Sequence, residues 1–308
     1  MMLYPFELKP VLKDIIWGGT RLASEYKKAE SGRKIAESWE LCVHENGANI
    51  IDNGIYTGKG LDYIFNLNKD IVKQGYNGDF PVLIKFIDAE QDLSVQVHPD
   101  DAYASKYDGE SGKTEIWYIM DCVPGAKLVY GLSSDYTRDE LADAIKCGRF
   151  EACLNYVDVK PGDIYFIPAG LIHAIGSGIL LAEIQQNSDT TYRLYDYNRP
   201  GADGKLRELH TEKALDVCVK TKSEYKNAGI TDCEYFTTAR YNNIRELNID
   251  TRKSFASIIC LDGKAEISCG GRKYNIEKGG SYFIPAGLDN IRLTGRLDII
   301  LTTLGGLS

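Results

Sequence analysis

The chain has 308 residues, of which 44% are hydrophobic and 26% are charged, and its formal net charge is −8. A chain of this length and composition can bury a large core, and its length favours two structural units. The acidic balance argues against non-specific nucleic-acid binding, and no apolar run reaches the roughly 20 residues that cross a bilayer.

The N-terminal stretch MMLYPFELKPVLKD has no apolar signal core followed by a cleavage site, so we expect a cytoplasmic protein. The eight cysteines are scattered, without a C-x-x-C pair and without a histidine at zinc-finger spacing. In a cytoplasmic protein such cysteines are expected to be reduced thiols rather than metal ligands.

Short runs rich in Val, Ile, Tyr and Phe recur between Gly, Asp and Pro through the middle of the chain, from PVLIKFIDA to ILLAEIQQ. Many short strands at this spacing predict a β-sandwich or barrel rather than alternating βαβ units. Helical patterns are fewer, and we expect helices near residues 60–75, 135–155 and 211–220, packed around the sheets. From about residue 231 the strand pattern returns, which predicts a second β-unit.

One motif occurs in both predicted units. The stretch GDIYFIPAGLIHAIG at residues 162–176 nearly repeats as GGSYFIPAGLDNIRL at residues 279–293, and the ungapped alignment sets His173 against Asn290. Proline and glycine end the strand in a turn in each copy. We therefore predict the same strand and turn in two related units, with a functional histidine in the first copy only.

Four polar side chains are candidates for a metal site. In LSVQVHPDD, strand alternation places the apolar residues on one face and Ser94, Gln96 and His98 on the other. The stretch GKTEIWYI brings Glu115 onto a following strand, and His173 follows the YFIPAG turn. Two imidazoles, a carboxylate and an amide oxygen from adjacent strands can converge in a small barrel, as a catalytic zinc or similar divalent site requires.

Several of these stretches together resemble one family. FPVLIKFIDAEQDLSVQVHPDD, GKTEIWYI, YFIPAGLIHAIG and AEIQQNSDTTYRLYDYNR, in this order, are similar to the type I phosphomannose isomerases, in particular their short bacterial branch. The resemblance covers most of the first 210 residues. It implies an all-β-dominated, double-stranded β-helix (cupin) fold with two cupin-like units and a few accessory helices. We expect a catalytic cupin domain at 1–230 and a cupin-like domain without a metal site at 231–308.

The resemblance also implies a reaction and a cofactor. The family interconverts mannose 6-phosphate and fructose 6-phosphate through an enediol, with one zinc-type ion per chain, other divalent ions being an alternative. Matched by motif, the family's metal ligands fall on Gln96, His98, Glu115 and His173. These are the four residues that strand alternation and ligand chemistry had already selected.

The remaining site residues follow from the same motifs. The family's active-site arginine falls on Arg193, its active-site lysines on Lys85 and Lys113, and its acidic residue on Asp189. We expect Arg193 to stabilise the enediolate, whereas the general base stays open between Lys113, Asp189 and a metal-bound water. Lys85 and Ser94 are predicted to bind the substrate phosphate, because the chain has no glycine-rich phosphate loop.

Two other functions stay open. A bicupin oxygenase or decarboxylase would use iron or manganese in a site richer in histidine, and Gln96 argues against it. A non-catalytic sugar-phosphate sensor would be favoured if Arg193 or Lys113 were missing. His44 and His210 lie outside the motifs and are predicted to be structural or surface residues. The expected partner is a small sugar phosphate, not nucleic acid or membrane, and the chain is predicted to be a monomer or a homodimer.

Overall fold

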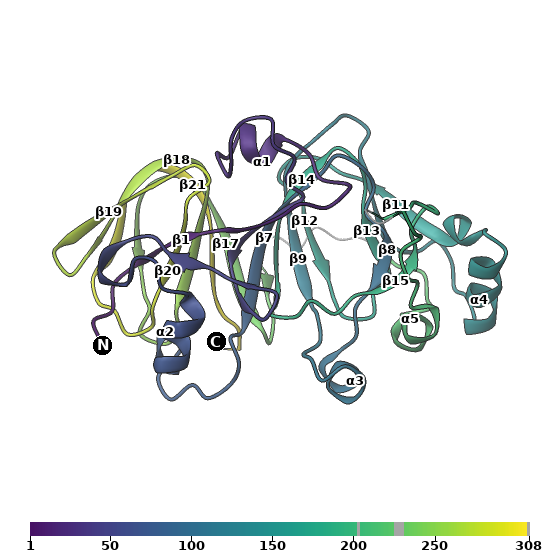
Figure 1. Cartoon of the computed structure of the whole chain (residues 1–308), viewed down its shortest axis with the longest axis horizontal. Helices are drawn as coiled ribbons and strands as arrows, with labels where there is room; N and C mark the ends of the chain where they lie inside the picture. The colour runs from purple at the N-terminus through teal and green to yellow at the C-terminus, as the bar shows by residue number, and fades with distance from the viewer. Residues whose placement is uncertain (202–203, 225–230, 307–308) are drawn as a thin grey trace.

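The computed structural model describes residues 1–201, 204–224 and 231–306, and most of its regular structure is strand (Figure 1). Three sheets follow one another along the long axis of the molecule: a C-terminal sheet, a six-stranded sheet and a five-stranded sheet. The predicted β-dominated fold is confirmed. The unit predicted to carry the metal site is built from two facing sheets, however, where the sequence suggested a small barrel.

The six-stranded sheet lies in the middle of the molecule and is covered on both faces. Its central strands are buried along all eight of their residues. Phe86 and Ala182 pack into the core shared with the C-terminal sheet, whereas Ile87 and Leu181 pack into the core shared with the five-stranded sheet. In order, its strands are β12 (Ile164–Ile167), β9 (Glu115–Cys122), β14 (Ile179–Gln186), β7 (Val82–Ala89), β3 (Glu37–Leu41) and β2 (Val11–Lys13).

The five-stranded sheet faces the six-stranded sheet with one side and carries helices on the other. Val97 packs against Leu141 and Leu215, so the apolar face of the sheet is turned to the helices α4 (Arg138–Lys146) and α5 (Thr211–Val217). The opposite face carries Gln96 and His173 and also Leu128 and Ile175, which pack into the core shared with the six-stranded sheet. In order, its strands are β11 (Leu154–Asp158), β10 (Lys127–Leu132), β13 (His173–Ile175), β8 (Val95–Val97) and β15 (Tyr192–Tyr195).

The C-terminal sheet contains strands from both ends of the chain. Its long strands pack Ile258, Ile267 and Ile299 into an apolar core of their own. The predicted division at residue 230 is crossed here, because β1 pairs with β20 and β6 pairs with β1. Its strands are β16 (Thr231–Asp232), β17 (Phe236–Ile249), β21 (Ile291–Leu304), β18 (Ala256–Cys269), β20 (Ser281–Ile284), β1 (Phe6–Lys9) and β6 (Ile50–Ile51), with β19 (Arg272–Glu277) paired to β18.

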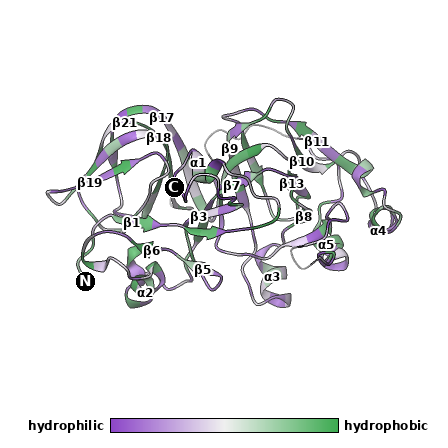
Figure 2. Ribbon diagram, turned by 45° about the horizontal axis from the view of Figure 1, so that its top comes forward, coloured by the Kyte–Doolittle hydropathy of each residue, from purple (hydrophilic) through white to green (hydrophobic). Residues whose placement is uncertain are grey.

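The helices are short and lie outside the sheets, and Figure 2 shows that α4 and α5 mix hydrophilic with hydrophobic residues. Helix α2 (Leu61–Leu67), helix α4 and helix α5 lie inside the three regions with helical patterns. The sequence analysis did not predict α1 (Arg21–Ser24) or α3 (Asp101–Tyr107), although Asp100 caps α3 by accepting from the Tyr103 N–H. In the described part of the chain no helix has the length and apolarity needed to cross a membrane. The remaining elements are β4 (Val43–His44), β5 (Gly47–Ala48) and the 3₁₀ turns Gly54–Tyr56, Lys69–Ile71 and Phe150–Cys153.

The repeated motif forms the same strand and turn twice. Strands β12 and β20 are each followed by Pro-Ala-Gly, and φ is +88° at Gly170 and +80° at Gly287. Side chains other than hydrogen rarely tolerate this left-handed conformation, which explains the glycine in both copies. The chain then enters β13 at His173 in the first unit and passes exposed Asn290 before β21 in the second.

Strand β3 joins the C-terminal sheet to the rest of the protein. The fully buried Glu40 carboxylate accepts from the Lys28 ammonium at 2.7 Å, from the Ser38 hydroxyl at 2.6 Å and from the Ser281 hydroxyl at the start of β20. Lys28 also donates to the carbonyl of Gly279. A buried ion pair with all of these hydrogen bonds in place fixes how β20 sits on β3.

Candidate metal centre

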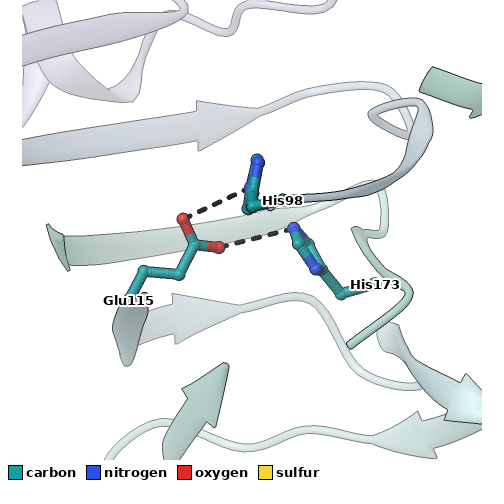
Figure 3. Close-up of side chains that lie close together, drawn as sticks. All are labelled: His98, Glu115 and His173. Carbon is teal, nitrogen blue, oxygen red and sulfur yellow. Dashed lines mark ion pairs between the residues drawn. The ribbon is translucent and has the colours of Figure 1, made fainter. Parts of the chain in front are cut away.

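Three of the predicted ligands meet between the two facing sheets. The donor atoms of His98, Glu115 and His173 all lie within 4.8 Å of one another. Figure 3 shows the Glu115 carboxylate between the two rings, with Oε2 3.6 Å from Nε2 of His98 and Oε1 3.4 Å from Nε2 of His173. All three side chains are buried, so their polar atoms must be satisfied inside the protein.

Both imidazoles are oriented by main-chain carbonyls. The Nδ1 of His98 lies 2.9 Å from the oxygen of Thr190, and the Nδ1 of His173 lies 2.8 Å from the oxygen of Leu171. Since a carbonyl only accepts, each Nδ1 carries the proton and each Nε2 presents its lone pair to the carboxylate. Burial lowers the pKa of both rings, to about 4 for His173, so both are neutral at neutral pH. Metal-binding imidazoles have this tautomer and this outer contact.

Gln96 completes the predicted set. It lies directly opposite His173 in the β8–β13 pair, and its Nε2 is 3.4 Å from Nε2 of His173. A half-turn of the amide places its oxygen in the same position. Gln96 and His173 come from the five-stranded sheet and Glu115 from the six-stranded sheet, while His98 follows the end of β8. The ligands therefore span two facing sheets, because helix α3 carries the chain from one sheet to the other.

The donor set fits a divalent cation. Among the described residues, the buried Oε1 of Glu115 has no hydrogen-bond donor, which is costly unless a cation or another donor satisfies it. Two neutral nitrogens face the same carboxylate. Two imidazoles, one carboxylate and one amide suit zinc with an open position, and related divalent ions use the same donors.

Lys113 touches this donor set directly. Its buried ammonium lies 3.1 Å from Nε2 of His98 and 2.5 Å from Oε2 of Glu115. Burial, then the nearby Glu183, raise the pKa of Glu115 to about 7, and Lys113 acts against this rise. The lysine that the sequence placed in the active site is therefore in contact with the ligands themselves.

A cavity of about 320 Å³ opens beside these ligands. Its wall combines residues from both facing sheets with residues from the segments that follow β14 and β15. All the other residues predicted for the site reach it. They are Lys85, Ser94, Lys113, Asp189 and Arg193, together with Gln96; Glu37, Glu183 and Arg207 also line it.

The buried carboxylate of Glu183 and the half-buried carboxylate of Glu37 hold the lysines in place in the cavity wall. Glu183 lies 3.3 Å from Nζ of Lys85 and 3.8 Å from Nζ of Lys113, and the Trp117 indole N–H donates to it at 2.9 Å. Glu37 lies 3.7 Å from the Lys85 ammonium. Burial opposes charge on Lys85, but Glu37 and Glu183 outweigh it and raise the pKa of that lysine. Lys85 therefore stays positively charged.

The sequence analysis missed Glu183, although a signal was present. Glu183 is the one acidic residue in the apolar strand ILLAEIQQ, and the register places it directly opposite Lys85 on one side and Trp117 on the other. A buried carboxylate between a lysine and an indole N–H is far more often paired than free. Its partners, however, come from other strands, so the local pattern alone did not reveal it.

The two remaining predicted residues lie at the edge of the cavity. Arg193 is opposite Gln96 in the β8–β15 pair, and its Nε donates to the Ser94 hydroxyl at 3.3 Å. Asp189 is exposed, and the Asn46 amide donates to it at 3.1 Å. The interpretation of His210 as structural agrees with its contact: its Nδ1 accepts from the Arg193 main-chain N–H at 3.2 Å.

Comparisons with known proteins point to one family. The chain matches the model "Phosphomannose isomerase type I, catalytic domain" over residues 5–120 and the model "Mannose-6-phosphate isomerase, cupin domain" over residues 227–304. Mannose-6-phosphate isomerase ManA of Bacillus subtilis is 39% identical over 99% of this chain and 100% of the relative. The mannose-6-phosphate isomerase of Streptococcus mutans is 33% identical over 97% of this chain and 98% of the relative.

Solved structures agree with this result. The crystal structure of the mannose 6-phosphate isomerase from Bacillus subtilis matches with a TM-score of 0.89 and 34% identity, covering 97% of this chain and 99% of that one. A mutant phosphomannose isomerase from Salmonella typhimurium matches with a TM-score of 0.79 at 16% identity, over 98% and 99% of the two chains, which shows the shared fold.

Proposed function

The chain belongs to the type I phosphomannose isomerases, and from this premise we propose that it interconverts mannose 6-phosphate and fructose 6-phosphate in the cytoplasm. We further propose that it uses one zinc ion, held by Gln96, His98, Glu115 and His173. The observation that carries the proposal is the convergence of two neutral imidazoles on a buried carboxylate, beside a cavity lined with lysine and arginine. No observation favours the oxygenase or the sensor over this function.

Isomerisation of an aldose to a ketose transfers a proton between C1 and C2 through an enediol. The negative charge that develops on the sugar oxygens must be stabilised in the transition state. When bound, the zinc ion supplies a positive charge and a Lewis acid at these oxygens. We assign a second positive charge to Arg193, since it lies directly opposite the ligand Gln96 and lines the same cavity.

The proton itself must be moved by a group at the cavity. Lys113 and Asp189 are the two candidates among the predicted residues, and they differ in position. Lys113 is buried against the ligands, whereas Asp189 is exposed at the cavity edge. We favour Lys113 for the proton transfer because it contacts the proposed metal ligands, and we propose that Asp189 accepts hydrogen bonds from sugar hydroxyls.

The substrate needs further contacts for its hydroxyl and phosphate groups. We propose Lys85 and Ser94 as substrate-binding residues, because both line the cavity and neither belongs to the metal set. Individual side chains of this kind hold phosphate where a chain has no glycine-rich loop. Lys85 is anchored by Glu37 and Glu183, so its ammonium is held at a fixed position before substrate arrives.

A coupled assay tests this function. Purified protein is given mannose 6-phosphate, and fructose 6-phosphate is detected before chelation, after chelation and after zinc is restored. We expect activity to disappear with the metal and to return with it. Full turnover by protein shown to contain no metal would disprove the zinc assignment. Absence of turnover on every hexose 6-phosphate would favour the sensor.

A further inference from the structure

We propose that Arg207 binds the phosphate group of the substrate, together with Ser94, at the arginine-rich end of the cavity. The inference rests on the proposed function, since it takes the substrate to be a hexose 6-phosphate. Arg207 belongs to none of the stretches that resemble the family. It is a candidate because it lines the same cavity as Lys85 and Arg193. Four observations, on charge, geometry, position and distance, lead to it.

The first observation is the distribution of charge in the cavity. The ammonium groups of Lys85 and Lys113 are already balanced by buried carboxylates, Glu183 among them. Arg193 has no carboxylate within 4 Å in the described part of the chain. Arg207 has one, Asp196, which it shares with Arg199. The surplus positive charge therefore lies at the arginine end, where a doubly charged phosphate is best accommodated.

The second observation is the geometry of Arg207. Its Nε and Nη2 donate to the two oxygens of Asp196, each at 2.6 Å, so that the two planar groups form a bidentate pair. Asp196 is buried and holds the guanidinium in one orientation. In the described residues Nη1 makes no hydrogen bond, which leaves one edge of the fork for an anion. An arginine fixed in advance loses little conformational entropy on binding phosphate.

The third observation is that hydrogen bonds hold the segment that contains Arg207 against Arg193. The Arg193 Nη1 donates to the carbonyl of Glu208 at 2.9 Å, and the His210 main-chain N–H donates to the carbonyl of Arg193 at 2.8 Å. Arg207 is thus held beside the end of β15. Burial, and then the charge of Arg207, lower the pKa of Arg193, so the two guanidinium groups repel one another. An anion bound between them relieves this repulsion.

The fourth observation concerns distance along β8. Ser94 precedes the ligand Gln96 by two residues, which is ~7 Å along an extended strand. The strand pairing brings Tyr195, the neighbour of Asp196, opposite Val95. Arg207 therefore lies toward the Ser94 side of the metal ligands. In a hexose 6-phosphate, four carbons, C3 to C6, separate the reacting C1–C2 end from the phosphate. The sugar is therefore long enough to place C1 and C2 at the metal ligands and its phosphate at Ser94 and Arg207.

Two arginines provide a matched test. Arg199 and Arg207 both bind Asp196, but only Arg207 lines the cavity. We expect R207Q to raise KM for mannose 6-phosphate about tenfold or more while kcat changes less than about threefold. Competitive inhibition by inorganic phosphate should weaken by the same factor. R199Q should leave both values within about twofold, and R207K should recover part of the loss. Circular dichroism and metal content verify that each variant is folded and loaded.

Two results would exclude Arg207 from phosphate binding. Equal effects of R199Q and R207Q would show that Arg207 only braces Asp196 and would overturn the proposal. A lower kcat with unchanged phosphate inhibition would overturn it as well, because Arg207 would then act at the reacting carbons. Phosphate binding to the zinc-loaded protein is also measured by calorimetry, without turnover. If the wild type fails to isomerise mannose 6-phosphate, the proposed function fails, while an affinity for phosphate that R207Q removes still supports the anion site.

Discussion

The two copies of YFIPAG follow the same backbone path and do different things. After β12 the turn leads to His173, which is buried and directed at Glu115. After β20 the turn leads to Asn290, which is exposed, while the other end of β20 docks on β3 through Ser281 and Glu40. In one unit the turn after the strand therefore carries a candidate metal ligand, and in the other the beginning of the strand forms the attachment to β3.

The interiors of the two units explain the difference. Between the two facing sheets, the carboxylates of Glu115 and Glu183 and the ammonium of Lys113 are buried together. Inside the C-terminal unit, the corresponding space is filled by an apolar cluster that includes Ile258 and Ile299. A histidine at the turn can bind metal only where other donors face it, so the surrounding strands, rather than the turn, decide the chemistry.

Replacing His173 with asparagine makes the first copy like the second and should have the largest effect. Without one imidazole the donor set keeps a single histidine, so we expect bound zinc to be lost and activity to fall to about 0.1% or less, with the fold retained. Metal analysis, activity and circular dichroism measure these three properties. Full zinc content with normal turnover would remove His173 from the ligand set.

Arg193→Ala tests whether bound metal is sufficient for activity in the first unit, or whether Arg193 is needed as well. We expect kcat to fall by about 10²- to 10³-fold with zinc still bound, because the variant loses a positive charge at the developing enediolate. His173→Asn serves as the contrast, since it should lose metal and activity together. Unchanged kcat for Arg193→Ala would exclude this residue from the chemistry.

Glu40→Gln tests the docking role of the second unit. The substitution leaves the Lys28 ammonium buried without its carboxylate, and we expect the free energy of unfolding to drop by about 3 kcal/mol. Ser281→Ala, which removes one hydrogen bond to the same carboxylate, should cost about 1 kcal/mol. Chemical denaturation measures both. Equal stability of wild type and Glu40→Gln would show that the ion pair does not hold the units together.

A smaller effect is expected from pH at Asp196, which follows β15 of the five-stranded sheet. Burial alone would raise its pKa, but Arg207 and then Arg199 outweigh burial and lower it. Because the folded pKa is depressed, the stabilisation is present above the unfolded value of about 3.9 and is lost as pH falls below it. The stability difference between wild type and Asp196→Asn should therefore shrink from pH 5 toward pH 2 in denaturant titrations. A stability difference that grows as the pH falls would show that folding does not lower the pKa of Asp196.

Asn290→His is the converse of the first substitution and should change almost nothing. The sequence has no histidine beyond His210, and the new side chain would stand on the surface beside an apolar interior. We expect unchanged activity and one zinc ion per chain. A second bound zinc would mean that the turn itself, rather than its surroundings, supplies the site.

The sequence revealed those site residues that a pattern of neighbouring residues marks. Alternation along β8 selected Gln96 and His98, and the repeated turn singled out His173; the structure brings both histidines to Glu115 and places Gln96 against His173. Arg207 could not be found in this way. It approaches the cavity only because the segment after β15 folds back along that strand.

The same limit applies to the sheets. Local patterns predicted strands, but which strands lie side by side depends on contacts between residues far apart in sequence. Phe6 pairs with Phe283, so the first strand of the chain belongs to the last sheet. The division at residue 230, drawn from the change in sequence pattern, does not include that strand.

The pairing of β1 with β20 has a consequence for biosynthesis. A ribosome delivers β1 long before β20, so the edge of β1 that pairs with β20 waits unpaired while the segments between these two strands are made. Helix α2 and the strands of the two facing sheets can assemble in the meantime. The C-terminal sheet therefore closes only after β20 and β21 have been made, although its first strand is synthesised before any strand of the two facing sheets.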